Sequence, residues 1–171
     1  MKILQRPLII LILIMSIAAC KKSKEGVKEE SVENTVIIEK EKQAILESLR
    51  TETEDAFNRD YQAWRTNWVH QPSVVKTYMN FADSSFSEML GWREVDDFVK
   101  TYIKEHPEPV PTPVQPDNVT IQVFGTGAWV SYRTFDETFG NKRETRLMVK
   151  EAGQWKIAGM HTTIYGFEPV R

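Results

Sequence analysis

Cysteine, histidine and excess positive charge are all scarce in this 171-residue sequence. The single cysteine, Cys20, excludes an intramolecular disulfide. Basic residues number 22 against 24 acidic ones and form no patch, so we expect no nucleic-acid partner. The histidines His70, His106 and His161 have no ligand spacing, which predicts no metal site. A glycine-rich phosphate loop and a GxSxG motif are also missing, so we expect no cofactor.

Long apolar runs are missing too, and the longest, residues 8–15, is too short to span a bilayer comfortably. Lys2 and Arg6 precede this run, and small residues follow it up to Cys20, as in a secretory signal peptide of residues 1–19. The ending IAAC resembles a bacterial lipobox. That resemblance implies acylation of Cys20, for example with palmitate, and a membrane anchor. Because Lys21 follows rather than aspartate, we expect an outer-membrane location in the cell envelope; the alternative is a cleaved signal with an incidental cysteine.

Residues 20–35 are rich in lysine and glutamate and poor in apolar side chains. Such a segment cannot bury enough surface to offset the entropy lost on ordering, so we predict a flexible tether after the lipidated cysteine. The remaining residues, 36–171, have the length of one ordinary domain.

This domain begins with helical patterns and ends with strand patterns. Apolar spacing predicts helices over 36–57, 60–69 and 91–106, and Asp60 is the expected N-cap of the second. A short hairpin is predicted around the DSS sequence between the last two helices. After a proline-rich connector, four strands separated by short turns predict an antiparallel meander. The fold class is therefore α+β.

The order of these elements resembles the nuclear transport factor 2-like superfamily, and its SnoaL-like members in particular. The resemblance covers nearly all of 36–165. It includes a third helix opening with GW and is most specific in the tail RLMVKEAGQWKIAGMHTT. The sequence is also similar to small lipoproteins of Bacteroidetes-type bacteria. The resemblance implies a cone-shaped fold in which three N-terminal helices pack on a curved antiparallel sheet, leaving a pocket at the wide end.

Strand alternation sorts the strand residues into two faces. The face expected toward the helices comprises Val119, Ile121, Val123, Ala128, Val130, Tyr132, Thr134, Thr145, Leu147, Val149, Ile157, Gly159, His161 and Thr163. The opposite face comprises Phe124, Trp129, Arg133, Phe135, Arg146, Met148 and Met160. This second face is unusually apolar for a solvated surface, which favours a homodimer formed through Trp129, Arg133 and Met148.

Aromatic residues favour binding of a small, partly apolar or planar ligand within the cone. The expected ligand-binding residues are Trp64, Trp68, Tyr78, Trp92, Tyr132 and His161. We place Trp64 nearer the core and Trp68 nearer the pocket mouth, while the alternative is that these aromatics only fill the core.

Two other functions stay open. The first is an acid–base enzyme of the isomerase, dehydratase or hydrolase type, with His161 and Asp83 as weak catalytic candidates. None of the aspartates occupies a persuasive inner-face strand position, which argues against it. The second is a homodimeric interaction module that uses the outer sheet face and binds no ligand in its pocket.

Overall fold

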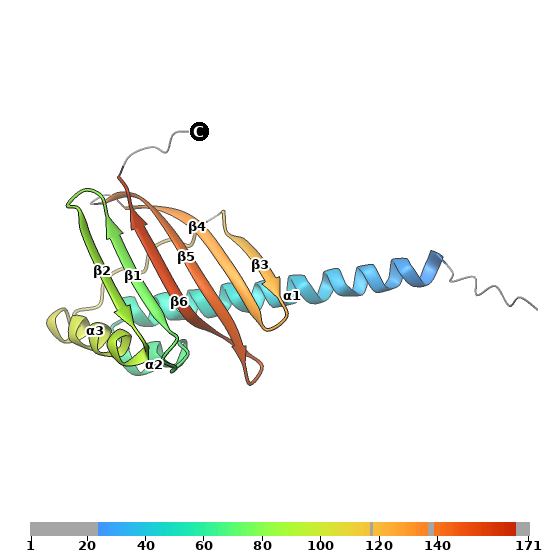
Figure 1. The fold of residues 1–171 in the computed structure, drawn as a ribbon, viewed down its shortest axis with the longest axis horizontal. Helices are drawn as coiled ribbons and strands as arrows, with labels where there is room; N and C mark the ends of the chain where they lie inside the picture. Colours follow the sequence, from blue (N-terminus) through green and yellow to red (C-terminus); the bar gives the residue numbers. More distant parts are fainter. Residues whose placement is uncertain (1–23, 117, 137–138, 167–171) are drawn as a thin grey trace, which may run out of the picture.

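The computed structural model describes residues 24–116, 118–136 and 139–166. The predicted signal peptide and Cys20 lie outside these residues. The fold is α+β, as predicted: helices come first and a six-stranded curved sheet follows (Figure 1). The elements in chain order are α1 (Lys24–Phe57), α2 (Tyr61–Thr66), β1 (Val75–Asn80), β2 (Ser85–Leu90), α3 (Trp92–Glu105), β3 (Thr120–Phe124), β4 (Gly127–Asp136), β5 (Gly140–Glu151) and β6 (Gln154–Ile164).

Helix α1 begins earlier than the sequence pattern indicates. It starts at Lys24, inside the segment 20–35 that composition predicts to be a flexible tether. Lysine and glutamate favour helix, and the segment contains no proline to interrupt the hydrogen bonds that continue into the amphipathic part. Residues 34–40 of α1 are exposed, and Ile45 is the first buried residue after them. The N-terminal part of α1 extends beyond the edge of the sheet (Figure 1).

The sheet has the strand order β2-β1-β6-β5-β4-β3. The predicted hairpin of β1 and β2 and the predicted meander of β3 to β6 are both antiparallel. The two units join through β1 and β6, which run parallel. This parallel pair is possible because α3 and the proline-rich connector separate the units along the chain.

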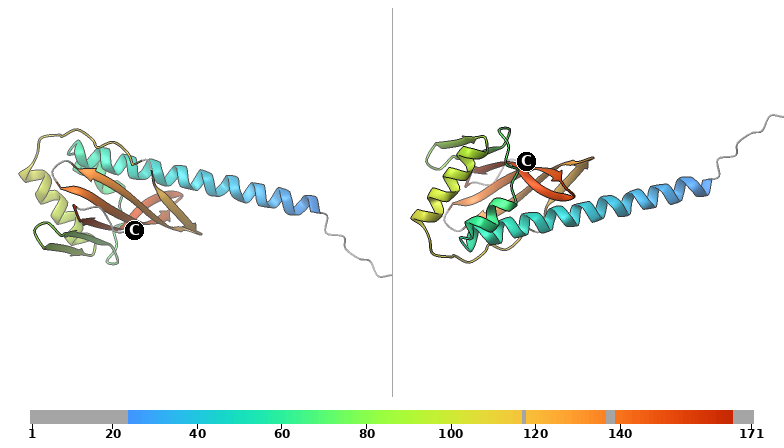
Figure 2. Two further views of the ribbon diagram at one scale, coloured as in Figure 1. Left: turned by 90° about the horizontal axis from the view of Figure 1, so that it is seen from above. Right: turned by 90° about the horizontal axis from the view of Figure 1, so that it is seen from below.

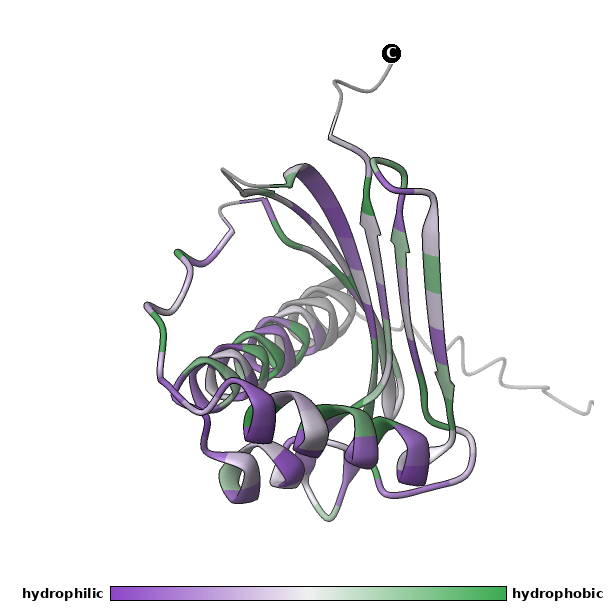
Figure 3. Cartoon of the chain, turned by 90° about the vertical axis from the view of Figure 1, so that its left-hand side faces the viewer, coloured by the Kyte–Doolittle hydropathy of each residue, from purple (hydrophilic) through white to green (hydrophobic). Residues whose placement is uncertain are grey.

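All three helices lie on the concave side of the sheet (Figure 2). The sheet curves over α1, and α2 and α3 lie toward one end, which gives the cone (Figure 3). The buried apolar core of this cone consists of Ile45, Leu49, Trp64, Trp68, Val69, Val74, Met89, Val95, Val99, Ala128, Val130, Met148, Trp155, Ile157, Ala158 and Met160. No helix in the described part of the chain is long and apolar enough to cross a membrane.

The faces of β3 and β4 are as predicted, but those of β5 and β6 need correction. In β5, Arg146 and Met148 are buried whereas Leu147 is exposed, the reverse of the prediction. Both faces of this strand carry apolar residues, so periodicity alone cannot orient it. Pairing of Met148 with inward-facing Ala128 settles the question.

A bulge reverses the prediction along the second half of β6. The register with β5 shifts so that Leu147 pairs with Gly159 while Met148 pairs with Ile157, leaving Ala158 as the extra residue. An inserted residue exchanges the two faces for every later position. Met160 and Thr162 therefore point inward, whereas His161 lies on the outer face.

Candidate functional site

Two tryptophans surround one carboxylate in the buried core. Trp64 and Trp68 are 1% and 0% exposed. Their indole nitrogens both donate to Oε1 of Glu52 in α1, at 2.8 and 3.2 Å, and Glu52 is itself buried. The prediction that Trp68 lies nearer a pocket mouth is therefore wrong, because both side chains belong to the core.

The local chain path explains why Trp68 is buried. Asp60 caps α2 as predicted, accepting from the Ala63 amide at 2.9 Å, but the helix ends at Thr66. The chain then runs beside β6, where the Val69 amide donates to Ile157 and the Ile157 amide donates to Asn67. This pairing fixes Trp68 against the centre of the sheet.

Trp92 supports this core from the first turn of α3. It is partly buried and stacks on Trp64, with 5.9 Å between ring centroids, and on His70 at 4.0 Å. Its role in the structure is packing between α2 and α3, although the sequence analysis places it among the ligand-binding residues.

Strand register places polar residues in two rows on the concave face, beyond the tryptophans. We define the cation row as five buried residues from adjacent strands: Val130, Arg146, Met160, Lys76 and Met89. The tyrosine row lies next to it on the same face, two residues later in β4, β6 and β1 and two residues earlier in the antiparallel strands β5 and β2. It consists of Tyr132, Glu144, Thr162, Tyr78 and Ser87. Because Ser87 is exposed, the tyrosine row reaches solvent at its β2 end.

One carboxylate links the two rows. Glu144 Oε2 lies 2.7 Å from Arg146 Nη2 and accepts from the Tyr132 hydroxyl at 3.0 Å. Tyr132 lies on the inner face, as predicted, and is partly buried. Tyr78, next to Ser87 in the row, packs against Phe98 of α3 with 6.1 Å between ring centroids.

Several buried polar groups of the cone have no hydrogen-bond partner among the described residues. Arg146 is 5% exposed, and its Nε and Nη1 atoms have no hydrogen-bond partner within the described part of the chain. The same holds for the hydroxyls of Thr162 and Thr134 on the same face. Such groups are rare in folded proteins, because each costs free energy comparable to a lost hydrogen bond.

Lys76 is the second buried cation of the cone. Its ammonium lies 3.0 Å from the Met160 sulfur, a weak acceptor, and 5.1 and 5.3 Å from the ring centroids of Trp68 and Tyr78. Lys76 and Arg146 are two strands apart, a separation of roughly 10 Å between backbones. The interior therefore contains two cations, Lys76 and Arg146, and two carboxylates, Glu52 and Glu144.

Burial and neighbouring charges shift the ionisation of this cluster. Burial raises the pKa of the Tyr132 hydroxyl, against the opposing effect of Arg146, so the group stays a protonated donor. Burial by itself lowers the pKa of Arg146, but Tyr132, Glu144 and Glu52 outweigh it and raise the pKa overall. The guanidinium is thus held charged inside the cone.

His161 and Asp83 do not form the predicted acid–base pair. His161 is exposed on the outer face, where its ring nitrogens hydrogen-bond to Thr77 and Thr163. Asp83 lies in the turn between β1 and β2, where it accepts from Asn80 and the Ser85 amide. The Ser85 and Asn80 hydrogen bonds hold the pKa of the Asp83 carboxyl below its usual value, so it stays ionised.

The outer face carries two of the three predicted dimer residues. Trp129 is 44% exposed, and Arg133 is exposed on the same strand. Met148 is fully buried within the chain, so it cannot contribute to an interface on that face. The exposed apolar residues on the outer face of β3, β4 and β5 are Phe124, Trp129, Phe135 and Leu147.

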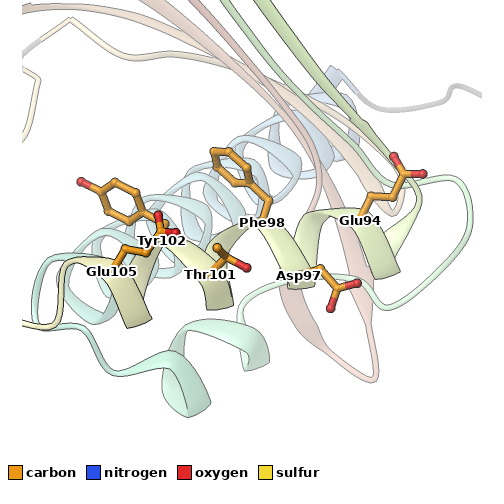
Figure 4. A pocket seen from close by; sticks show the side chains of 6 residues that line it. All are labelled: Glu94, Asp97, Phe98, Thr101, Tyr102 and Glu105. Atoms are coloured by element: carbon orange, nitrogen blue, oxygen red, sulfur yellow. The ribbon is translucent and has the colours of Figure 1, made fainter.

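An open hollow of about 440 Å³ lies along α3 and shares Phe98 with the cone interior, where that ring packs against Tyr78 (Figure 4). Its lining comes from α3 alone: Glu94, Asp97, Phe98, Thr101, Tyr102 and Glu105. It contains none of the predicted ligand-binding residues, and its three carboxylates disfavour anions. The cone interior is therefore the better candidate site. No metal-binding group of three or more histidine, cysteine or acidic residues occurs in the described ranges.

Four polar residues of the site could not be identified from the sequence pattern, and all but Glu144 are buried: Glu52, Lys76, Glu144 and Arg146. The sequence contains one indication for Arg146: it lies two residues before Met148 in β5 and therefore shares its face of the strand. Had Met148 been assigned to the core, Arg146 would have been placed inside with it. No comparable signal marks Lys76, because charged residues within strands usually face solvent.

Comparison with known proteins supports the fold. No family model matches the sequence, and no curated protein does. A cystatin-like fold protein from Burkholderia xenovorans superposes with a TM-score of 0.58 at 19% identity, over 74% of this chain and 92% of its own. A nuclear transport factor 2-like superfamily protein from Salmonella enterica superposes with a TM-score of 0.54 at 16% identity, over 75% of this chain and 94% of its own. A nuclear transport factor 2-like protein of unknown function from Pseudomonas putida superposes with a TM-score of 0.55 at 13% identity, over 74% of this chain and 93% of its own.

At these identities the likeness establishes the architecture and leaves the activity to be argued from the site. The resemblance seen in the sequence is confirmed at that level. The chain has the nuclear transport factor 2-like fold.

Proposed function

We propose that this chain is a membrane-anchored lipoprotein that binds a small, partly apolar or planar ligand inside its cone. The observation that carries this proposal is the set of buried donors on the concave face, Arg146, Thr134 and Thr162, that lack partners within the described residues. A bound molecule with acceptor atoms would satisfy them.

Aromatic rings beside these donors suit the apolar part of such a ligand. Tyr132 and Tyr78 occupy the tyrosine row, and Phe98 packs against Tyr78 from α3. Rings of this kind present flat apolar surfaces to a planar ligand. The site therefore lies one layer farther from the core than Trp64 and Trp68, and it excludes His161.

The anchoring part of the proposal rests on the signal-peptide pattern and on Cys20. Helix α1 begins at Lys24, shortly after that cysteine, and its residues 34–40 are exposed. In an anchored protein this part of the helix would act as a stalk between the envelope membrane and the cone.

Filling the cone tests ligand binding directly. Ser87→Trp adds a large side chain to the tyrosine row at its exposed end, whereas Phe86→Trp adds one to the outer side of the same strand. Thermal shifts would be measured with a panel of planar anionic, neutral and cationic compounds. We expect at least one class to stabilise the parent and Phe86→Trp but not Ser87→Trp. The proposal fails if no compound stabilises the parent, or if Ser87→Trp responds equally.

A second candidate function is a homodimer formed through the outer sheet face. The exposed side chains of Trp129 and Leu147 favour it, since these residues are direct neighbours on adjacent strands. Phe124 and Phe135 extend the apolar surface along β3 and β4. A dimer of this kind leaves the concave face free and is compatible with ligand binding.

A further inference from the structure

The cation row contains a charged group whose hydrogen-bonding capacity is only partly used. Arg146 contacts Glu144 through Nη2, while Nε and Nη1 have no partner in the described part of the chain. Its side chain is 6% exposed, so bulk water does not satisfy these groups. A buried guanidinium with N–H groups to spare is a built recognition element for an anionic acceptor.

We propose that the ligand of this cone carries a carboxylate and that Arg146 anchors it. The inference rests on the proposed ligand-binding function and specifies the ligand's chemical class. A carboxylate is a planar acceptor that matches the guanidinium geometry. Lys76, across Met160 in the same row, has only a thioether sulfur as its hydrogen-bond acceptor in the described structure and adds a second positive charge.

The charges around Arg146 favour a monoanion over a phosphate dianion. Two carboxylates, Glu144 and Glu52, already act on the guanidinium and offset the charges of Arg146 and Lys76. A dianion would meet stronger repulsion from Glu144, which stays 2.7 Å from Nη2. A cationic ligand would face Arg146 and Lys76 together and is disfavoured as well.

The donors around the anchor define how the ligand is oriented. Thr162 lies beside Glu144 in the tyrosine row, and its buried hydroxyl is unpartnered among the described residues. The Tyr78 ring lies in that same row between Thr162 and the exposed end at Ser87, and the Tyr132 ring lies at the opposite end, beside Glu144. The carboxylate would therefore lie deep, against Arg146, with the apolar body between the tyrosines.

The test compares benzoate with benzamide, a neutral analogue of the same shape, and with inorganic phosphate. Calorimetric titrations would use the full chain, Arg146→Met, Arg146→Lys, and the control Arg133→Met, which changes an exposed arginine on the outer face. We expect the parent to bind benzoate at least ten-fold more tightly than benzamide or phosphate. Arg146→Met should lose this preference, Arg146→Lys should keep part of it, and Arg133→Met should behave as the parent.

A further variant protects the test against misfolding of the arginine variants. Glu144→Gln removes the competing carboxylate while keeping a similar shape, so benzoate affinity should rise about three- to ten-fold, as loss of a nearby like charge predicts. The carboxylate inference is overturned if the parent binds benzoate and benzamide equally. It is also overturned if the benzoate affinity of Arg146→Met or Glu144→Gln equals that of the parent. Neither result contradicts the proposed ligand binding itself. Absence of binding by all three probes overturns the carboxylate inference, and the compound panel with Ser87→Trp then decides separately on ligand binding.

Discussion

Glu52 and Trp64 are joined by a buried hydrogen bond of 2.8 Å, in which the indole nitrogen donates to the carboxylate. The same oxygen accepts from Trp68 at 3.2 Å. The carboxylate of Glu52 thus satisfies the only polar side-chain atom of each tryptophan. This arrangement makes the tryptophans structural and leaves the polar rows beyond them as the candidate site.

Replacing Glu52 tests that role. Glu52→Leu leaves two buried indole N–H groups without an acceptor, at about 1–3 kcal/mol each, so we expect a loss of roughly 2–6 kcal/mol in the free energy of unfolding. Glu52→Gln keeps a carbonyl acceptor and should cost less. Glu47→Gln, in an exposed ion pair on the same helix, serves as the control. Urea unfolding measures all three, and equal stabilities of Glu52→Leu and Glu47→Gln would contradict the assignment.

The two tryptophans should be equally important for stability. Because both are fully buried, Trp64→Ala and Trp68→Ala should each lower the free energy of unfolding by about 3–5 kcal/mol. Thermal and urea melts of the two variants provide the comparison. A much milder effect of Trp68→Ala would restore the idea that this residue lines a pocket mouth.

Acid should weaken the contact between α1 and the β5–β6 turn region. Hydrogen bonds from Lys150 and then Trp155 lower the pKa of Glu41 from its ordinary value of 4.5. The pKa of Glu41 is lower in the folded state than in the unfolded state. Its contribution to the free energy of unfolding is therefore fully present at a pH above the unfolded-state pKa, and it is lost as the pH falls through the folded-state pKa. Glu41→Gln should therefore melt below the parent at pH 7, with the difference shrinking below pH 4.5. A pH-independent difference between the two melting curves would refute this linkage.

The proposed dimer can be tested at Trp129. This side chain is 44% exposed on the outer face, so Trp129→Glu should leave the fold intact and convert a dimer to monomers. Met148→Glu, by contrast, places a charge in the core and should unfold the chain. Sedimentation velocity and circular dichroism separate the two effects. A parent protein that is already monomeric at tens of micromolar, roughly the range for specific association, would exclude the dimer.

Membrane anchoring is tested at Cys20, which lies outside the described residues. Cys20→Ser should abolish incorporation of labelled palmitate and release the protein from the membrane fraction, or leave its signal peptide uncleaved. The matched control is Ser23→Ala, which keeps the cysteine. Lipid labelling of Cys20→Ser at the parental level would show that the lipobox resemblance is misleading.

The sequence by itself determined the order and type of the elements. Apolar spacing is set by the helical and strand repeats, and capping by Asp60 is a local interaction, so both can be read without tertiary contacts. The hairpin, the third helix and the meander follow from the same local rules. These elements were also sufficient to indicate the fold.

Only the tertiary structure decided which side chains face the interior of the cone. The sheet carries apolar residues on both faces, so alternation cannot orient β5, and a single extra residue at Ala158 reverses the faces along the rest of β6. His161 consequently lies outside, whereas Arg146 lies inside. The pairing of Glu52 with two tryptophans and of Lys76 with Met160 depends on the packing of α1 and on the parallel contact between β1 and β6. Such contacts join residues far apart in the chain, and their register is set by the whole sheet rather than by any local pattern.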